Sequence, residues 1–194
     1  MKINPIVKQI FNDLESDEIY KYLETKEFQY HKPYKRYNKI VKVPRGQMSF
    51  TVDSSIHYDY GKVAGGSPPN ELMDEKLLAV TGLVNKALGT SFNTILMNVY
   101  KDGKDSIGAH ADKENGWAPG SGFATLSFGT ERNFVIIENS TGEKTKILHK
   151  KGMVIEMPWP MNMHYEHAVP PAGVNKSGVE QWRISLTFRE IMKS

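Results

Sequence analysis

The pattern of hydrophobic and polar positions predicts two helices in the first half of the chain. Residues 5–28 have a helical pattern, in which Ser16 can cap the turns that follow it. In residues 68–89, apolar side chains recur at helical spacing; Asn70 can cap this segment and Gly89 can end it. Residues 37–60, between these segments, have a pattern of strands and turns. We therefore expect two helices with strands between them.

The second half of the chain has an almost entirely β pattern. From residue 93 onward, short β-rich runs alternate with turn residues; the runs are TILMNVY, GFATLSFG, NFVIIE, KTKILHK, GMVIEM and WRISLTFRE. Helices followed by many short strands indicate an α+β protein with a β-sandwich or jelly-roll core. A length of 194 residues fits one domain with a substantial core.

The last of these runs, residues 182–190, has charged and hydroxyl side chains on a single face. Because side chains alternate along a strand, Arg183, Ser185, Thr187 and Arg189 share one face and hydrophobic residues share the other. An exposed sheet edge explains this row. An inward-facing row that binds a small dicarboxylate through its guanidinium groups explains it equally well. The two arginines lie roughly 20 Å apart on an ideal strand, so one small ligand would need long side chains and strand curvature to reach both.

A second run, residues 94–100, also has polar side chains on one face. Asn98 and Tyr100 point the same way, so an amide and a phenol can contact the same ligand. Side chains of these types also close local hydrogen bonds at strand ends, and the run alone does not separate the two possibilities.

His110 and Asp112 have the spacing of two metal ligands on a strand. The same spacing occurs in ordinary polar pairs at loop edges. The chain has no cysteine, so any metal would be bound by His and carboxylate, a set that favours iron, manganese or zinc. The third ligand would be another histidine, and the candidates are His31, His57, His149, His164 and His167. His31 and His57 lie in the basic N-terminal half, and His149 looks like a residue at a strand end. His164 and His167 are three residues apart, so on an extended chain only one of them can face the site.

The net charge is only +3, but residues 31–45 contain six lysines and arginines, no acid, and interleaved tyrosines. Such a segment can neutralise phosphates and stack on bases, and it can equally be a solvated hairpin rich in lysine. No apolar run approaches the roughly 20 residues that span a bilayer. We expect a soluble, intracellular protein that does not bind membranes.

Residues 93–190 resemble the AlkB family of iron(II)/2-oxoglutarate dioxygenases, which repair alkylated nucleic acids. The matching segments, in order, are NVYKDGKDSIGAHADKE, APGSGFATLSFGTERNF, KGMVIEM, HYEHAVP and RISLTFR. Residues 1–92 resemble the substrate-recognition lid of the family more loosely, through VPRGQMSF and IHYDYG. The resemblance implies a double-stranded β-helix core of the jelly-roll or cupin type in residues 93–194. Residues 1–92 would pack on it as helices and lid, in one compact and monomeric unit.

The resemblance also assigns the metal and co-substrate sites. It implies that iron(II) is bound by His110, Asp112 and His167. It implies that 2-oxoglutarate is bound by Asn98, Tyr100, Arg183, Ser185 and Arg189. Arg183 would bind the distal carboxylate, and three open positions on the metal would accept the oxo acid and O2. Family members often have Asn at the position of Ser185.

The resemblance further implies how the substrate base is held once it has been extruded from a duplex. The residues expected to contact substrate are Tyr37, Arg45, Tyr58, Tyr60 and Glu114. Tyr60 would stack on the base opposite His110, with Tyr58 and Glu114 at its edge. Arg45 would brace the lid, and Tyr37 lies where duplex-acting relatives insert an aromatic wedge. Lys113 replaces an acid that is usual in the family, which leaves Glu114 as the partner of a cationic base.

The implied function is oxidative demethylation of bases such as 1-methyladenine and 3-methylcytosine in DNA, RNA or both. 2-Oxoglutarate would be converted to succinate and CO2, and the methyl group would leave as formaldehyde. Two alternatives stay open: the same chemistry on a protein, a small molecule or another modified base, and a non-catalytic nucleic-acid-binding module. A zinc hydrolase would explain two histidines and an aspartate but not the paired arginines.

Overall fold

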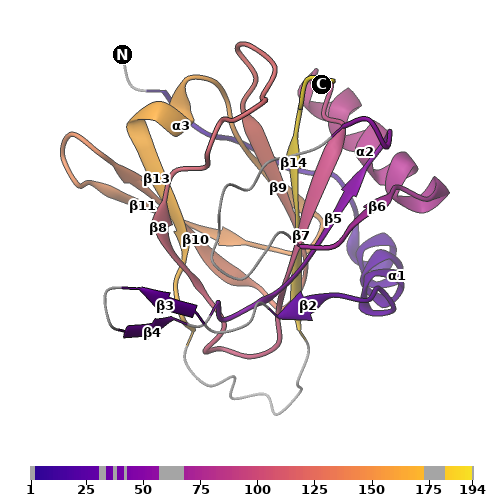
Figure 1. Ribbon diagram of the computed structural model, residues 1–194, viewed down its shortest axis with the longest axis horizontal. Helices are drawn as coiled ribbons and strands as arrows, with labels where there is room; N and C mark the ends of the chain where they lie inside the picture. The colour runs from indigo at the N-terminus through magenta and orange to yellow at the C-terminus, as the bar shows by residue number, and fades with distance from the viewer. Residues whose placement is uncertain are drawn as a thin grey trace.

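The computed structural model describes residues 3–30, 34–36, 39–41, 43–56, 68–172 and 182–193, with the backbone alone for 34–36 and 39–41. Two mostly antiparallel sheets face each other, and two helices cover the outer face of the larger sheet (Figure 1). This arrangement agrees with the predicted α+β fold with a jelly-roll core.

The larger sheet combines strands from both halves of the chain. In spatial order they are β1 (Ile6–Gln9), β12 (Met153–Met157), β9 (Phe123–Gly129), β14 (Arg183–Arg189), β7 (Thr94–Tyr100), β5 (Gly46–Thr51) and β2 (Gln29–Tyr30), with β6 (Asn70–Leu72) parallel to β5. β14 lies between β9 and β7 and pairs with both along its whole length. The strand with two arginines is therefore central rather than an edge.

The smaller sheet is made entirely from the second half of the chain. In spatial order its strands are β11 (Lys144–His149), β10 (Arg132–Glu138), β13 (Tyr165–Val169) and β8 (Ile107–His110). A separate hairpin, β3 (Tyr34–Arg36) and β4 (Lys39–Val41), lies below it in Figure 1, and the short helix α3 (Met161–His164) precedes β13. The strands predicted beyond residue 93 are all present.

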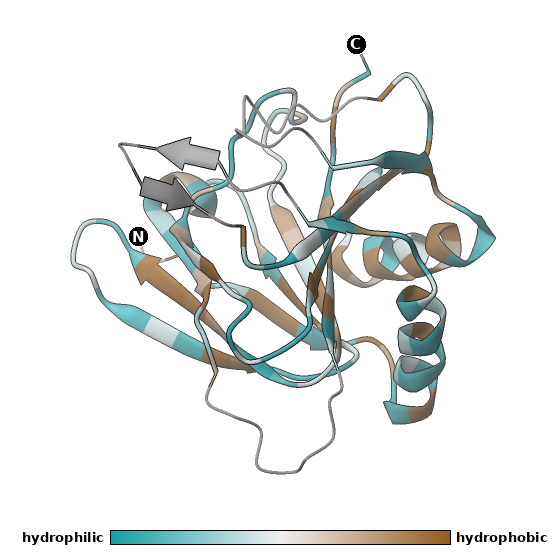
Figure 2. Ribbon diagram, turned by 60° about the horizontal axis from the view of Figure 1, so that its bottom comes forward, coloured by the Kyte–Doolittle hydropathy of each residue, from teal (hydrophilic) through white to brown (hydrophobic). Residues whose placement is uncertain are grey.

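Two hydrophobic clusters hold these layers together. One lies between the larger sheet and the helices α1 (Asp13–Glu24) and α2 (Glu75–Leu88), which carry apolar and polar residues along their length (Figure 2). The other lies between the two sheets and includes Phe123, Phe134 and Ile155. No helix of the described residues is long and apolar enough to cross a membrane.

The first helix begins later than the sequence pattern predicts. Residues 6–9, expected to be helical, form β1 and pair with β12 at the edge of the larger sheet. The N-cap is Asn12 rather than Ser16, because Asn12 and Glu15 exchange side-chain and backbone hydrogen bonds in a capping box. Ser16 lies inside the helix, where its hydroxyl donates to the carbonyl of Asn12.

The second helix also begins later than predicted. Asn70, the expected cap, lies in β6, and the N-cap is Asp74, whose side chain accepts from the backbone N–H of Leu77. Gly89 ends the helix as predicted, in the left-handed conformation that glycine adopts without strain. Strand pairing with β5 removes the first residues of the segment from the helix.

Candidate active site

A cavity of about 340 Å³ lies between the two sheets. Side chains of β5, β7, β9 and β14 line it on one side, and those of β8, β10 and β13 line it on the other. Because both sheets contribute, residues far apart in the sequence meet in this cavity.

The polar face of β14 points into this cavity. Arg183, Ser185, Thr187 and Arg189 all line it, and every residue of the strand is buried. The hydrophobic residues between them pack in the core under the helices. This excludes the exposed-edge explanation of the row.

Three potential metal ligands converge at one end of the cavity. One ligand atom from each of His110, Asp112 and His167 lies within 4.8 Å of the others. His110 ends β8 and is the register partner of His167 on β13, while Asp112 follows in the loop after β8 rather than on the strand itself. His164 lies at the end of α3 and does not belong to this cluster.

His110 is prepared to bind a metal through Nε2, and His167 offers a neutral imidazole. The Nδ1 of His110 lies 2.9 Å from the carbonyl of Gly108; a carbonyl only accepts, so Nδ1 carries the proton and the lone pair of Nε2 is available. His167 is buried and stacks on Phe134 with ring centroids 5.6 Å apart. Burial lowers the pKa of His167 to about 3, despite the nearby Asp112, so its imidazole is neutral.

Arg189 orients the carboxylate of Asp112. The Nε and Nη2 of Arg189 both donate to Oδ2 of Asp112, the first at 3.0 Å. The other oxygen, Oδ1, lies 3.4 Å from Nε2 of His110 and 3.9 Å from Nε2 of His167. Although burial opposes ionisation, the guanidinium of Arg189 holds the pKa of the Asp112 carboxyl well below its usual range. The carboxylate therefore stays charged, with one oxygen directed at the imidazoles.

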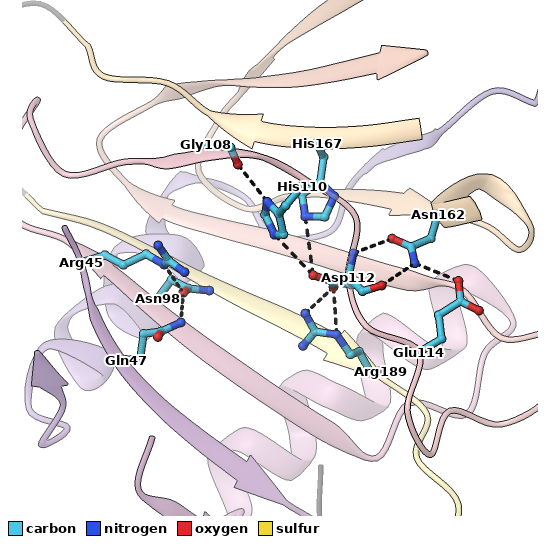
Figure 3. Close-up of polar contacts among 10 residues, drawn as sticks. All are labelled: Arg45, Gln47, Asn98, Gly108, His110, Asp112, Glu114, Asn162, His167 and Arg189. Carbon is cyan, nitrogen blue, oxygen red and sulfur yellow. Dashed lines mark hydrogen bonds and ion pairs between the residues drawn. The ribbon is translucent and has the colours of Figure 1, made fainter. Parts of the chain in front are cut away.

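Asn162, on α3, holds the backbone of the same loop. Its Oδ1 accepts from the N–H of Asp112 at 2.9 Å, and its Nδ2 donates to the carbonyl of Asp112 at 3.0 Å. The same Nδ2 donates to Glu114 at 2.8 Å (Figure 3). The side chain of Asn162 is buried, so this clamp is shielded from water.

These donors fit a divalent metal such as iron(II). Two neutral imidazole nitrogens and one carboxylate oxygen on one side of an ion form the 2-His-1-carboxylate set, which leaves positions open for other ligands. The hydrogen bonds to Gly108, Arg189 and Asn162 fix His110 and Asp112 from behind, as outer partners do in metal sites, while His167 is held by packing against Phe134.

Arg183 is a buried cation that forms no ion pair within the part of the chain that the structure describes. Only 2% of its surface is exposed. Its Nε donates to Oγ of Ser127 at 3.1 Å, its Nη2 donates to Nδ1 of His149 at 3.2 Å, and its guanidinium carbon lies 4.9 Å from the ring centre of Tyr100. Nη1 is buried without a hydrogen-bond partner among the described residues. A buried guanidinium in a cavity wall favours an anionic ligand that supplies the missing acceptor.

Asn98 lies on β7 in the cavity wall, opposite Ser185 of β14 and Gln47 of β5. Its Oδ1 accepts from Nε of Arg45 at 3.0 Å and from Nε2 of Gln47 at 2.8 Å (Figure 3). With its oxygen engaged, its NH2 group is the part that can donate to a ligand. Gln47 lines the cavity as well and was not singled out from the sequence.

The structure brings some of the expected substrate residues to the cavity. Arg45 and Lys113 line it. Glu114 is not among the lining residues, and its carboxylate lies on the other side of Asp112 from Asn98, toward Asn162 (Figure 3). Three further residues expected to contact substrate lie outside the described residues: Tyr37, Tyr58 and Tyr60.

The supporting roles of two residues near the site could not be recognised from the sequence. His149 appears in the sequence as an ordinary strand end, and Asn162 lies in a short segment without a recognisable period. Their partners are 34 and 50 residues away, so only the packing of the sheets reveals their contacts.

Comparisons with known proteins agree with this geometry. The model of the 2OG-Fe(II) oxygenase superfamily matches residues 5–189. The chain is 32% identical to DNA oxidative demethylase ALKBH2 from Homo sapiens, over 94% of this chain and 71% of that protein.

Solved structures share the fold. "The structure of OsALKBH1" superposes with a TM-score of 0.66 at 15% identity and covers 98% of this chain and 99% of that one. An oxidoreductase of the 2OG-Fe(II) oxygenase family from Burkholderia pseudomallei superposes with a TM-score of 0.61 at 16% identity, covering 95% and 84%. The double-stranded β-helix fold predicted from the sequence is thereby confirmed.

Proposed function

This chain belongs to the 2OG-Fe(II) oxygenase superfamily, and we propose that it is an oxidative demethylase of alkylated DNA bases such as 1-methyladenine and 3-methylcytosine. As a member of the superfamily it is a dioxygenase that uses iron(II), 2-oxoglutarate and O2. The substrate part of the proposal is supported by the similarity to ALKBH2, which is named a DNA oxidative demethylase.

One observation carries the proposal. The His110, Asp112 and His167 cluster shares a cavity with Arg183, whose Nη1 is buried without a partner among the described residues. A hydrolytic metal site needs no such cation. A co-substrate with a carboxylate at each end accounts for both features, since one end can bind the metal while the other meets a guanidinium.

We assign the roles of the chain's own residues accordingly. His110, Asp112 and His167 hold iron(II), which when bound supplies the oxidation of a C–H bond coupled to decarboxylation of 2-oxoglutarate. Arg183 binds the distal carboxylate of 2-oxoglutarate through Nη1.

Further residues complete the co-substrate site. Tyr100 and Asn98 offer a phenol and an amide N–H from β7, and Ser185 lines the cavity beside Arg183. Arg189 contributes by fixing Asp112. The methylated ring atom of a paired base is hidden in a duplex, so the base enters the cavity only after extrusion or from a single strand. Leu96, Phe123 and Val169 supply apolar walls that limit water around it.

Direct assay of methyl removal tests the proposal. Purified protein is incubated with iron(II), ascorbate and 2-oxoglutarate, together with single- and double-stranded DNA and RNA that contain 1-methyladenine or 3-methylcytosine. We expect loss of the methyl mass from at least one DNA substrate and release of formaldehyde. Asp112→Ala should abolish both, because it removes the only carboxylate of the metal cluster.

The same assay separates the alternatives. Turnover of 2-oxoglutarate without loss of the methyl group from any oligonucleotide would contradict the nucleic-acid substrate and favour a protein or small-molecule substrate. Demethylation of RNA alone would move the substrate class from DNA to RNA. If the protein neither turns over 2-oxoglutarate nor demethylates any oligonucleotide, the proposed activity is overturned altogether.

A further inference from the structure

His149 is a fully buried histidine that does not belong to the metal cluster. It is the last residue of β11, on the smaller sheet, and its side chain reaches Arg183 on the larger sheet. Buried polar side chains need hydrogen-bond partners, and the ring nitrogens of His149 contact Arg183 and the carbonyl of Met153, with the backbone of Thr125 also close to the ring. Those partners determine where its proton lies.

The contacts of His149 allow only one tautomer. Nε2 lies 2.9 Å from the carbonyl of Met153, which only accepts, so Nε2 carries the proton. Nδ1 lies 3.2 Å from Nη2 of Arg183, which only donates, so Nδ1 is the acceptor. The ring is therefore neutral in this geometry, because a second proton on Nδ1 would replace a hydrogen bond with repulsion between two cations. Burial and Arg183 agree with this: they lower the pKa of His149 to about 3.

The guanidinium of Arg183 is held by several contacts at once. Oγ of Ser127 accepts from Nε, and His149 accepts from Nη2. Tyr100 lies against the guanidinium, with its ring centre 4.9 Å from the central carbon. A planar guanidinium fixed at two nitrogens cannot rotate, so the direction of Nη1 is set as well.

We infer that His149 is a positioning residue of the 2-oxoglutarate site, which holds Arg183 so that its Nη1 is directed at the distal carboxylate of the co-substrate. The inference rests on the proposed role of Arg183. It adds that the hydrogen-bond acceptor at position 149, and not the aromatic ring, is what matters. By holding Arg183, this neutral acceptor makes the site prefer oxo acids with a second carboxylate over those without one. An acidic residue there would instead neutralise Arg183, and a cation would displace it.

A matched pair of variants isolates the acceptor. His149→Asn places Oδ1 on the same side-chain carbon that carries Nδ1, so it keeps an acceptor for Arg183. His149→Leu has nearly the same shape without the acceptor. Both lose the ring, so the cavity left behind is similar and any difference between them reports on the hydrogen bond.

Binding to the iron(II)-loaded protein in the absence of O2 is measured by titration calorimetry. The ligands are 2-oxoglutarate and 2-oxovalerate, which lacks the distal carboxylate. We expect His149→Leu to bind 2-oxoglutarate about tenfold or more weakly than His149→Asn, as for a lost hydrogen bond to a charged group. Binding of 2-oxovalerate should differ little between them, whereas a general packing defect would weaken both ligands equally.

The outcomes separate this inference from the proposed function. Parent protein that does not bind 2-oxoglutarate would overturn the proposed function. Parent protein that binds it, with equal affinities for the two folded variants, would overturn only the role of His149. Nitrogen-15 spectra of the unmodified protein provide a second test that needs no variant. The proton of His149 should be on Nε2 from pH 5 to 8, and a proton on Nδ1 would contradict the inference.

Discussion

Arg189 donates two hydrogen bonds to the same oxygen of Asp112, Oδ2, and thereby leaves Oδ1 facing the two histidines. The two residues come from different sheet regions, the end of β14 and the loop after β8. The orientation of a metal ligand thus depends on a strand that itself supplies no ligand to the cluster.

We expect Arg189→Met to weaken iron(II) binding by about 10- to 100-fold, the usual effect of removing an outer partner of a metal ligand. The carboxylate of Asp112 would then be free to rotate, and its pKa would rise because burial is no longer opposed by the guanidinium. Competition of the protein with a metal-sensitive dye measures the affinity. Arg183→Met is the control, because it should weaken the binding of 2-oxoglutarate and leave the binding of iron(II) nearly unchanged.

Asn162→Leu should reduce both stability and metal affinity. Leucine has the shape of asparagine but leaves the N–H and the carbonyl of Asp112 without their partner. An unsatisfied buried polar group costs about 1–3 kcal/mol, so the free energy of unfolding should fall by about that amount. Urea denaturation and the same metal titration measure the two effects.

Glu114→Gln is the matched control for Asn162→Leu. Its amide oxygen still accepts from Nδ2 of Asn162, so the clamp on Asp112 is preserved. We expect iron(II) affinity close to that of the parent. A tenfold loss in this control would show that the charge of Glu114, rather than the clamp, supports the metal site.

The decrease in the free energy of unfolding at acidic pH should depend on His149. Its pKa is lowered from 6.5 to about 3, so the unfolded chain binds the proton first and the folded state loses stability as the pH falls from about 6.5 toward 3. One such group contributes a slope of up to about 1.4 kcal/mol per pH unit. Urea denaturation at pH 6, 5 and 4 should therefore show a shallower decline for His149→Asn than for the parent. Parallel declines would contradict the neutral state of His149.

Lys113 should influence which alkylated bases react. Its side chain lines the cavity, and a positive charge there disfavours a cationic base such as 1-methyladenine. We expect Lys113→Gln to raise kcat/KM for 1-methyladenine relative to neutral 1-methylguanine by about fivefold, corresponding to about 1 kcal/mol. Lys146→Gln, on the exposed side of β11, is the control and should not change the ratio.

The local pattern predicted β7, β9, β10, β11, β12 and β14, together with the polar face of β14. It did not predict β8 and β13, the strands that carry His110 and His167. Alternation along a strand is a local property, so Arg183, Ser185, Thr187 and Arg189 could be placed on one face without knowledge of the fold. Whether that face pointed outward or inward could not be decided locally. Pairing with both β7 and β9 made the strand central, and packing of its apolar face under the helices left its polar face toward the cavity.

The N-terminal half was predicted less well for the same physical reason. β1 gains its hydrogen bonds from β12, which is distant in sequence, and β6 gains them from parallel pairing with β5. A prediction from local helix propensity therefore made both helices too long, because it included residues that belong to the sheet. The observed N-caps therefore differ from the predicted ones: Asn12 caps the first helix instead of Ser16, and Asp74 caps the second instead of Asn70.

The sequence by itself determined which side chains are available for the site: the histidines and aspartate, the two arginines on one strand face, and the absence of cysteine. Only the tertiary structure decided how they are used, namely which oxygen of Asp112 faces the histidines, which nitrogen of Arg183 is left for a ligand, and that His149 and Asn162 support them. Side-chain identity and alternation are local properties of a chain. Hydrogen-bond partners across two packed sheets are set only when the sheets meet.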